Sequence, residues 1–322
     1  MIIVTGGAGF IGSAMIWRLN QDGFTDILVV DNLGKSDKWK NLVNRNFIDY
    51  VHRDVFLDHL YSNHFSNIKA IIHMGACSAT TQHDADFLMK NNYAFSVKIA
   101  QYALNNKIRL INASSAATYG DGDKGFDDDT TQLSSLRPLN MYGYSKHLFD
   151  LWALRSGALD QIVSLKFFNV FGPNEYHKKD MTSVIYKAYF QARTTGKIKL
   201  FKSYRDDYAD GEQRRDFVYV KDCVEVMAWL LKDTKINGLF NLGTGLDRSW
   251  NDLAQAVFTA LNLPAEIEYI KMPDNLKDRY QYYTCSNNRK LIDAGQPIQF
   301  SQLETSVKDY VRNYLSTQDP YL

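Results

Sequence analysis

A tyrosine and a lysine four residues apart, Tyr142 and Lys146, lie in the segment Asn140-Met141-Tyr142-Gly143-Tyr144-Ser145-Lys146. In a helix, side chains at this spacing share one face, so the ammonium would stand beside the phenol and lower its pKa. A base that works near pH 7 needs a phenol pKa about 3 units below the free value of about 10, or about 4 kcal/mol. Lysine alone supplies less, so we expect a cationic cofactor to assist. Tyr144 falls elsewhere on the helix, and we assign the base to Tyr142.

A glycine-rich turn, Gly6-Gly7-Ala8-Gly9-Phe10-Ile11-Gly12, follows the first apolar run of the chain. Glycines at this spacing let the backbone approach a pyrophosphate, and the following helix supplies amide donors. Asp31 follows the second apolar run, where a ribose-binding carboxylate belongs. We therefore expect a nicotinamide dinucleotide. Asp31 alone favours NAD, but Asn32, Lys38 and Arg53 could neutralise the 2′-phosphate of NADP, so we prefer NADP and keep NAD as the alternative.

A serine pair, Ser114 and Ser115, follows another apolar run within Asn112–Gly120. Residues at the carboxyl ends of parallel strands line the ligand crevice of such sheets. A hydroxyl there can hydrogen-bond a substrate oxygen and stabilise an alkoxide that is passing to a ketone. Together with Tyr142 and Lys146, the serine pair predicts hydride transfer between an alcohol carbon and the nicotinamide.

Short apolar runs alternate with helix-length segments, which predicts an α/β fold: a Rossmann-type doubly wound parallel sheet with a smaller C-terminal substrate-binding α/β domain. We expect residues 1–170 and about 216–245 to bind the dinucleotide, and about 171–215 and 246–322 to bind substrate. Residues 202–213 are polar and predict an exposed loop. The expected strands are Ile2–Val4, Ile27–Val30, Ala70–Ile72, Ile108–Asn112, Gln161–Phe168, Asp216–Val220 and Leu239–Leu242, and the expected helices lie near 11–21, 87–105 and 142–156.

The composition is ordinary for a globular protein, with 322 residues, 45% hydrophobic and 23% charged. A net charge of +1 argues against a nucleic-acid partner. Cys77, Cys223 and Cys285 are widely spaced, which favours a reducing compartment and predicts no metal site. We find no signal-peptide pattern and no long apolar run, so we expect a cytoplasmic protein without a membrane partner.

Further motifs resemble those of the extended short-chain dehydrogenases/reductases that act on nucleotide sugars. They are Ile72–Ala76, Phe168–Pro173, Arg215–Val220 and Asn241–Gly245. This resemblance implies that Ser115, four residues before Tyr119, is the catalytic serine that acts with Tyr142 and Lys146.

Other segments resemble the ADP-L-glycero-D-manno-heptose 6-epimerase family more closely. They are Gly75-Ala76-Cys77-Ser78 with Thr80 and Thr81, Pro138–Lys146, Gly172–Lys178 and Leu276–Gln281. The resemblance implies inversion at C6 of the heptose in an ADP-sugar, through a transient 6-keto intermediate, in lipopolysaccharide core heptose biosynthesis. It also implies a homo-oligomer, with a pentamer among the forms it allows.

By this resemblance Lys178 is a second acid/base. Inversion of an alcohol requires the hydride to return to the other face of the ketone, so the alcohol oxygen occupies two positions and one fixed base cannot serve both. We expect Tyr142 to serve one position and Lys178 the other. From the residues alone, His177-Lys178-Lys179 would equally suit a solvated basic loop or a diphosphate contact.

The resemblance also implies which side chains touch each ligand. Lys166, Asp180 and Lys187 depart from the family pattern, which commonly has arginine, a smaller residue and histidine there. The expected substrate contacts are Asn169, Asp180, Lys187, Phe201, Arg215 and Tyr280, with Arg215 toward the diphosphate. The expected cofactor contacts are Gly6, Gly9, Phe10, Ile11, Gly12, Asp31, Asn32, Lys38, Arg53, Gly75, Ala76, Cys77, Ser78, Asn92, Lys146, Val170 and Lys178.

Two alternatives stay open at this point. The first is another nucleotide-sugar enzyme on the same fold, such as a UDP-hexose 4-epimerase. The second is a non-catalytic NADP-binding protein, against which the presence of Ser115, Tyr142 and Lys146 together argues.

Overall fold

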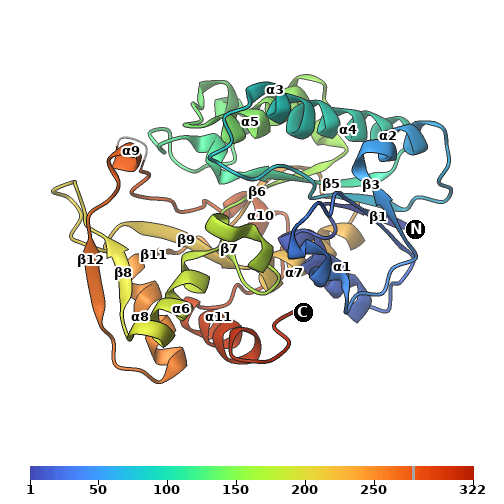
Figure 1. Cartoon of the computed structure of the whole chain (residues 1–322). Coiled ribbons are helices and arrows are strands. Elements are labelled where there is room, and N and C mark those ends of the chain that lie inside the picture. The colour runs from blue at the N-terminus through green and yellow to red at the C-terminus, as the bar shows by residue number, and fades with distance from the viewer. Residues whose placement is uncertain (278–279) are drawn as a thin grey trace.

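A seven-stranded parallel sheet forms the centre of the computed structural model, which describes residues 1–277 and 280–322 (Figure 1). Its strand order is β10-β6-β5-β4-β1-β2-β3. The order reverses direction between β1 and β4, and in open α/β sheets the crevice at such a switch point holds the ligand. The strands are β1 (Ile2–Thr5), β2 (Ile27–Asp31), β3 (Asp49–His52), β4 (Ala70–His73), β5 (Arg109–Ser115), β6 (Val163–Phe167) and β10 (Gly238–Leu242).

Helices cover both faces of this sheet (Figure 1). The face toward α2 (Arg53–Tyr61), α4 (Phe95–Asn105) and α5 (Met141–Arg155) lies opposite the face toward α1 (Phe10–Gln21) and α7 (Val220–Lys232). The strands β1, β2 and β4 are buried along their whole length, as expected for a parallel sheet that is covered on both sides. The Rossmann-type α/β fold is therefore confirmed.

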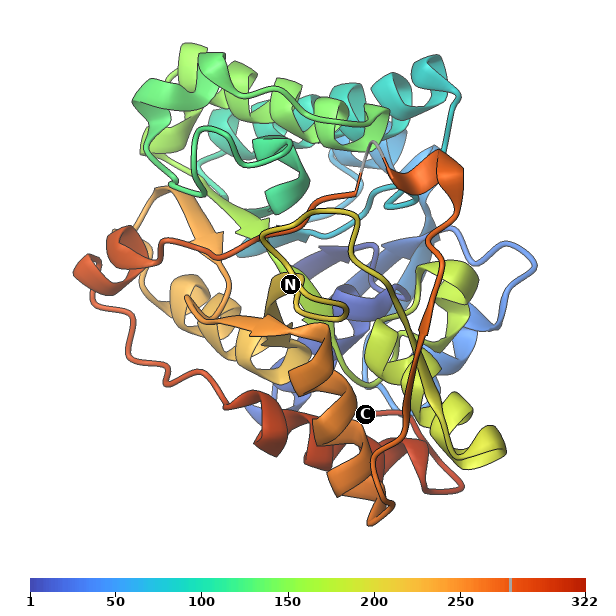
Figure 2. The same cartoon turned by 90° about the vertical axis from the view of Figure 1, so that its left-hand side faces the viewer.

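Two smaller sheets are formed by later segments of the chain. They lie on the side of the molecule that Figure 2 turns to the viewer. One contains β11 (Asp247–Ser249), β9 (Arg214–Tyr219) and β7 (Asn169–Phe171), and the other pairs β12 (Ile267–Ile270) with β8 (Ile198–Phe201). The helices here are α6 (Val184–Thr195), α8 (Trp250–Leu261), α9 (Asp274–Lys277), α10 (Arg289–Asp293) and α11 (Leu303–Tyr310). Within the described ranges, no helix is long and apolar enough to cross a membrane.

Two differences between the expected and the observed elements concern the first half of the chain. The sequence pattern predicted neither β3 nor α2, because Asp49–His52 is a short edge strand with an exposed, polar composition. The helix expected near 87–105 is divided into α3 (Ala85–Leu88), a π-helical turn (Met89–Ala94) and α4. Residues 202–213 contain no helix or strand, as expected for a loop.

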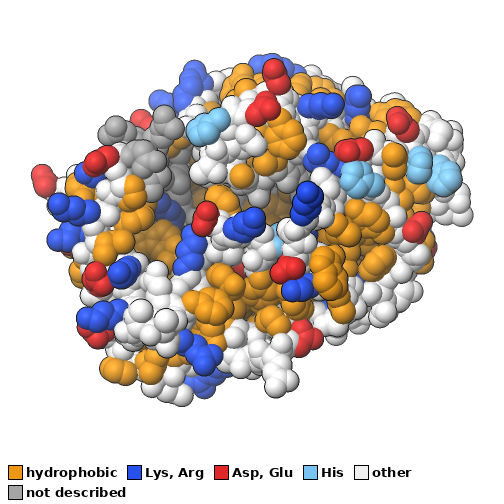
Figure 3. All heavy atoms as spheres, viewed as in Figure 1, with side chains coloured by type: hydrophobic (Ala, Val, Ile, Leu, Met, Phe, Trp, Pro, Cys, Tyr) orange, Lys and Arg blue, Asp and Glu red, His pale blue; other side chains and the backbone are white. Residues whose placement is uncertain are grey.

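The surface carries both signs of charge. In Figure 3, lysine and arginine side chains alternate with aspartate and glutamate on the face that is shown. This distribution agrees with the net charge of +1 and offers no single-sign area for a polyanion on that face.

Candidate active site

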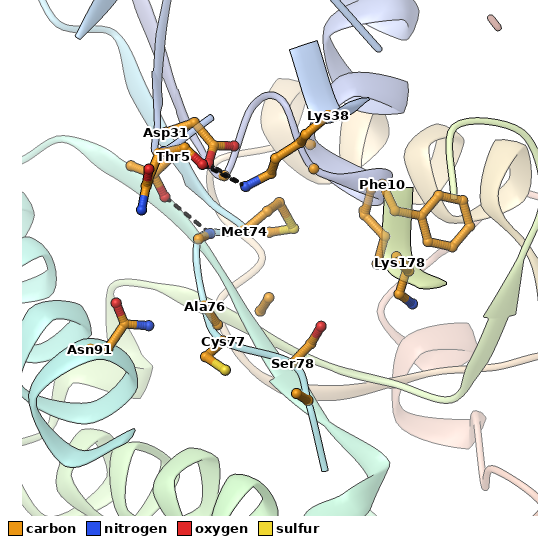
Figure 4. A pocket seen from close by; sticks show the side chains of 18 of the residues that line it. Thr5, Phe10, Asp31, Lys38, Met74, Ala76, Cys77, Ser78, Asn91 and Lys178 are labelled. Carbon is orange, nitrogen blue, oxygen red and sulfur yellow. Dashed lines mark hydrogen bonds and ion pairs between the residues drawn. The ribbon is translucent and has the colours of Figure 1, made fainter. Parts of the chain in front are cut away.

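One cavity of about 620 Å³ lies at the carboxyl ends of β1, β4 and β5. It is bounded by the glycine-rich turn, by Met74–Ala79 after β4, and by Ser115, Tyr142 and Lys146. Figure 4 shows Lys178 and Phe10 across the cavity from Cys77 and Asn91. Ser115, Tyr142, Lys146 and Lys178, which are separate in the sequence, are therefore brought to one space.

The glycine-rich turn leaves room only for backbone. A Cβ atom at Gly12 would lie 2.1 Å from the Gly6 carbonyl oxygen, so a larger residue would displace the turn. The turn leads into α1, whose first amides face the cavity end of the sheet, and the Ala8 amide donates to the Asp31 carboxylate at 2.8 Å. A cradle of this shape at a helix N-terminus fits a dinucleotide pyrophosphate.

The carboxylate of Asp31 is buried beside a cation. Lys38 Nζ lies 2.6 Å from Asp31 Oδ1, and both side chains line the cavity (Figure 4). Arg53 lines it as well and donates to Asn91 Oδ1. Two cations thus line the cavity, and Lys38 is the one that lies beside Asp31.

Tyr142 and Ser115 meet because α5 approaches the turn after β5 closely. A Cβ atom at Gly143 would lie 2.6 Å from the Ala117 carbonyl oxygen, so glycine permits this approach. The Asn140 side chain caps the helix by accepting from the Gly143 amide at 2.8 Å. The Ser115 hydroxyl accepts from the Ala117 amide at 3.1 Å and lies close enough to Tyr142 to favour its phenolate, whereas Ser114 donates to Asp150 at 2.7 Å. Of the two serines, Ser115 therefore faces the phenol.

The pKa of Tyr142 is raised, because burial disfavours the phenolate more than the Ser115 hydroxyl favours it. The sequence-based expectation that Lys146 brings this pKa down is thus wrong for the protein alone. Lys146 Nζ donates to the Ala113 carbonyl at 2.7 Å, and burial lowers its pKa to about 8. Burial is the largest cause of both pKa shifts, which leaves the lowering of the phenol pKa to a cationic cofactor.

A buried ion pair joins α5, the helix of Tyr142 and Lys146, to strand β6. Lys166 is fully buried, and its Nζ lies 3.0 Å from Asp150 Oδ2, one helical turn beyond Lys146. Lys166 also donates to the Thr118 hydroxyl and lies 4.5 Å from the centre of the Tyr119 ring. Lys166, where the family commonly has arginine, therefore makes structural contacts and does not line the cavity.

Replacing Lys166 with methionine is expected to lower the free energy of unfolding by about 3–5 kcal/mol, because the Asp150 carboxylate would stay buried without its cation. Urea denaturation measures this change. Lys197→Met is the control, since Lys197 pairs with Glu266 at the surface, and we expect no measurable change for it. Equal stabilities of the two variants would contradict the buried pair.

Lys178 lies on a short 3-10 turn (Tyr176–Met181) after β7. Its Nζ is 5.2 Å from the centre of the Phe10 ring, and burial lowers its pKa, with Glu175 opposing. The neighbouring His177 also lines the cavity, and burial lowers its pKa to about 4. Near neutral pH the histidine is uncharged, which leaves Lys178 as the cationic proton donor of this turn on the cavity lining.

Asn92 does not line the cavity, although it was expected to contact the cofactor. It is fully buried, and its side chain bonds to both the amide and the carbonyl of Cys77, at 2.8 and 3.0 Å. Asn91 lines the cavity instead. Both residues lie in the π-helical turn Met89–Ala94, and the expectation for Asn92 came from the family resemblance. Asn92 therefore holds the Cys77 segment in place.

The residues expected to contact substrate lie beyond this cavity. Arg215 lies 5.4 Å from the Tyr280 ring and donates to the backbone carbonyls of Arg214 and Gln281. The rings of Phe201 and Tyr280 pack edge to face, with their centroids 6.4 Å apart. In the resembling segment Leu276–Gln281, Asp278 and Arg279 lie outside the described residues. The three side chains form one aromatic and cationic group on the C-terminal side.

The other three expected substrate residues, Asn169, Asp180 and Lys187, are also absent from the cavity lining. Asn169 lies between the lining residues Phe168 and Val170, and its Oδ1 accepts from Thr284 at 3.3 Å. Lys187 Nζ donates to the Asp180 carbonyl at 2.6 Å. Strand β7 pairs with β9, so Asn169 connects the cavity to the strand that carries Arg215.

Some lining residues carried no recognisable sequence signal. Most of them lie at the same strand ends as the residues that were predicted, so strand topology is the signal that could have found them, whereas Asn91, Phe95 and Met181 lie on helical segments. The lining residues without a signal are Thr5, Val30, Leu33, Gly34, Ser36, Met74, Ala79, Asn91, Phe95, Ala113, Phe167, Phe168 and Met181.

The model of the NAD dependent epimerase/dehydratase family matches residues 2–243. The chain belongs to this family. Membership implies a nicotinamide cofactor, which the glycine cradle, Asp31 and the cations beside it fit. In this epimerase/dehydratase family member, the match spans every residue of the Ser115, Tyr142, Lys146 and Lys178 group.

Curated relatives of this family member match over its full length. It is 59% identical over 323 residues to the ADP-L-glycero-D-manno-heptose-6-epimerase of Nitratidesulfovibrio vulgaris, and the match covers 100% of both chains. It is 47% identical over 332 residues to the enzyme of the same name from Fusobacterium nucleatum, again with 100% of both chains covered.

Solved structures share the fold. The ADP-L-glycero-D-manno-heptose-6-epimerase of Helicobacter pylori is 27% identical, with a TM-score of 0.82 that covers 98% of this chain and 96% of that chain. A UDP-N-acetylglucosamine 4-epimerase from Methanobrevibacter ruminantium has a TM-score of 0.79 at 22% identity, covering 97% and 96%, which shows the fold alone.

Proposed function

We propose that this protein epimerises ADP-D-glycero-β-D-manno-heptose at C6 to ADP-L-glycero-β-D-manno-heptose, through a transient 6-keto intermediate, in lipopolysaccharide core heptose biosynthesis. The observation that carries the proposal is the presence of two proton-transferring groups, Tyr142 and Lys178, on the lining of one cavity that fits a dinucleotide. A one-way dehydrogenase needs one such group, whereas inversion needs two. The full-length relatives of this name support the choice of sugar.

When bound, the nicotinamide accepts the C6 hydride and returns it. The chain's own groups handle the proton. One of Tyr142 and Lys178 removes the proton of the C6 hydroxyl as the C6–H bond breaks, which leaves a ketone. Ser115 can donate to the ketone oxygen and stabilise the charge that develops there. The other group protonates the oxygen after the exocyclic end has turned over. We propose that the ADP-sugar is held by Asn169, Asp180, Lys187, Phe201, Arg215 and Tyr280.

Turnover of defined sugars tests this proposal. The purified protein should convert ADP-D-glycero-heptose to its C6 epimer and leave UDP-hexoses unchanged. Turnover of UDP-glucose without turnover of the ADP-heptose would overturn the proposal in favour of a 4-epimerase. Binding of nucleotide without turnover of either sugar would favour the non-catalytic alternative.

We propose NADP as the cofactor, because Lys38 lies beside Asp31 and Arg53 lines the same cavity. Replacing Lys38 with alanine is expected to weaken NADP binding by about 2 kcal/mol, or roughly 30-fold, since a charge-assisted bond to the 2′-phosphate is lost. NAD binding should change little, because Asp31 would remain available to the ribose hydroxyls. Titration of the nucleotide-free protein measures both affinities.

Lys35→Ala is the matched control, because Lys35 is exposed in the same segment. If Lys38→Ala weakened NAD and NADP equally, Lys38 would not recognise the phosphate. The mass of the nucleotide that copurifies with the unaltered protein is an independent check. Assembly as a homo-oligomer, with a pentamer among the possible forms, is part of the same proposal and follows from the family resemblance alone. We also propose a location in the cytoplasm, because three widely spaced cysteines favour a reducing compartment.

A further inference from the structure

Asn41 joins the glycine-rich turn to the turn that carries Lys178. It is 2% exposed, on a 3-10 helix (Asp37–Leu42) that also carries Lys38. Its Nδ2 donates to the Ala8 carbonyl at 2.9 Å and to the Asn174 carbonyl at 3.0 Å, and lies 3.2 Å from His177 Nδ1. One side chain therefore ties together the cofactor cradle and the segment just before Lys178.

Asn174 extends this connection. It is fully buried with a φ of 77°, a left-handed conformation that asparagine tolerates better than most residues. Its Nδ2 donates to the Ser13 hydroxyl of α1 at 2.9 Å, and its Oδ1 accepts from the Leu322 amide at 3.0 Å. The segment before Lys178 is thus attached to α1 as well.

The segment Asp319–Leu322 holds the same turn from its other side. Tyr176 donates its hydroxyl proton to the Pro320 carbonyl at 2.6 Å, and its ring meets the edge of the Tyr321 ring at 5.3 Å. Arg45 donates to the Leu322 carbonyl. Figure 1 shows this segment ending between α11 and α1. We call Asn41, Asn174 and Asp319–Leu322 the clasp.

Among the residues that the structure describes, the Lys178 ammonium makes no hydrogen bond and no salt bridge, although the Glu175 carboxylate is close enough to act on its pKa. The Lys178 ammonium lies over the Phe10 ring, and the Lys178 amide donates to the Glu175 carbonyl at 3.0 Å. A contact with a ring face is weak and does not fix the ammonium at one point. The place of the ammonium in the cavity is therefore set by the attachment of its backbone, and the clasp supplies that attachment.

We propose that Asn41 is a positioning residue that keeps Lys178 in register with the cofactor cradle, with Asn174 and Asp319–Leu322 completing the clasp. The proposal rests on the function proposed above, in which Lys178 transfers a proton. Displacement of a reacting group by about 1 Å can cost about 100-fold in rate. Substrate and cofactor binding do not require Lys178 to be placed so closely.

Asn41→Leu tests the proposal, since leucine keeps the volume and removes both donors. We expect kcat to fall about 10- to 100-fold, with KM and the amount of bound NADP unchanged. Asn20→Leu is the matched control: Asn20 also bridges two backbone carbonyls, those of Phe24 and Asn46, whereas Asn41 bridges to Asn174 and lies beside His177. Native kcat in Asn41→Leu, or an equal loss in Asn20→Leu, would overturn the proposal.

A second measurement needs no activity and so separates this proposal from the proposed function. Acetic anhydride should acylate Lys178 faster in Asn41→Leu than in the unaltered protein, while acylation of the exposed Lys179 stays the same, as read by peptide mass spectrometry. Equal rates at Lys178 would overturn the clasp, whatever the substrate proves to be. If Asn41→Leu does not fold, Tyr176→Phe loosens the clasp from the other side and should show the same acceleration.

Discussion

Tyr142→Phe is expected to lower kcat for epimerisation by about 100- to 10,000-fold, the usual contribution of a positioned acid or base. The substitution removes the phenol hydroxyl and keeps the ring, so the packing of α5 against the turn after β5 is preserved. The content of bound nicotinamide cofactor should stay native, because Lys146 and the glycine-rich turn are unchanged. Steady-state turnover of ADP-heptose together with the nucleotide absorbance of the purified protein measures both quantities.

Tyr144→Phe provides the control on the same helix. Tyr144 is 45% exposed and faces away from the cavity lining, so its loss should leave kcat unchanged. If the two variants had equal rates, the assignment of the base to the tyrosine four residues before Lys146 would be wrong. A Tyr142→Phe protein without cofactor would instead assign this residue to binding.

Lys178→Met is expected to lower kcat for epimerisation by a comparable factor, about 100- to 10,000-fold. Burial lowers the pKa of Lys178, so its neutral amine is more populated near neutral pH than in an exposed lysine. This direction of the pKa shift favours exchange of a proton by Lys178. Methionine keeps the length of the side chain over Phe10 and removes this capacity.

Tyr142→Phe and Lys178→Met should each lose oxidation of a different epimer. Each epimer presents its hydroxyl to a different group, so Lys178→Met should still oxidise one epimer and Tyr142→Phe the other. Absorbance of reduced nicotinamide after rapid mixing with each epimer distinguishes them. Loss of oxidation of the same epimer in both variants would contradict a two-base mechanism. Lys179→Met is the control, because Lys179 is exposed beside Lys178 and should retain native kcat.

Local patterns in the sequence were sufficient for the frame of the site. The glycine-rich turn between an apolar run and a helix requires only neighbouring residues, and so does the pairing of Tyr142 with Lys146 on α5. The buried strands follow from apolar runs in the same way, with ends that differ by a few residues. The Rossmann-type fold could therefore be predicted, since each βα unit is a local structure.

The family resemblance added what local patterns could not. From its residues alone, His177-Lys178-Lys179 suits a solvated loop, and only the resemblance assigned Lys178 a role. The structure places Lys178 on the cavity lining with its pKa lowered by burial. Its action as the second base stays a prediction, for which Lys178→Met is the test.

By itself, the sequence determined the fold, the cofactor cradle and the pairing of Tyr142 with Lys146, because these depend on short-range spacing. The tertiary structure alone decided that Ser115 and not Ser114 meets the phenol, and that Lys166 pairs with Asp150. It also decided the sign of the Tyr142 pKa shift, since desolvation depends on every segment that covers a group. The link from Asn41 to the Lys178 turn spans 133 residues, and no local pattern records a contact of that separation.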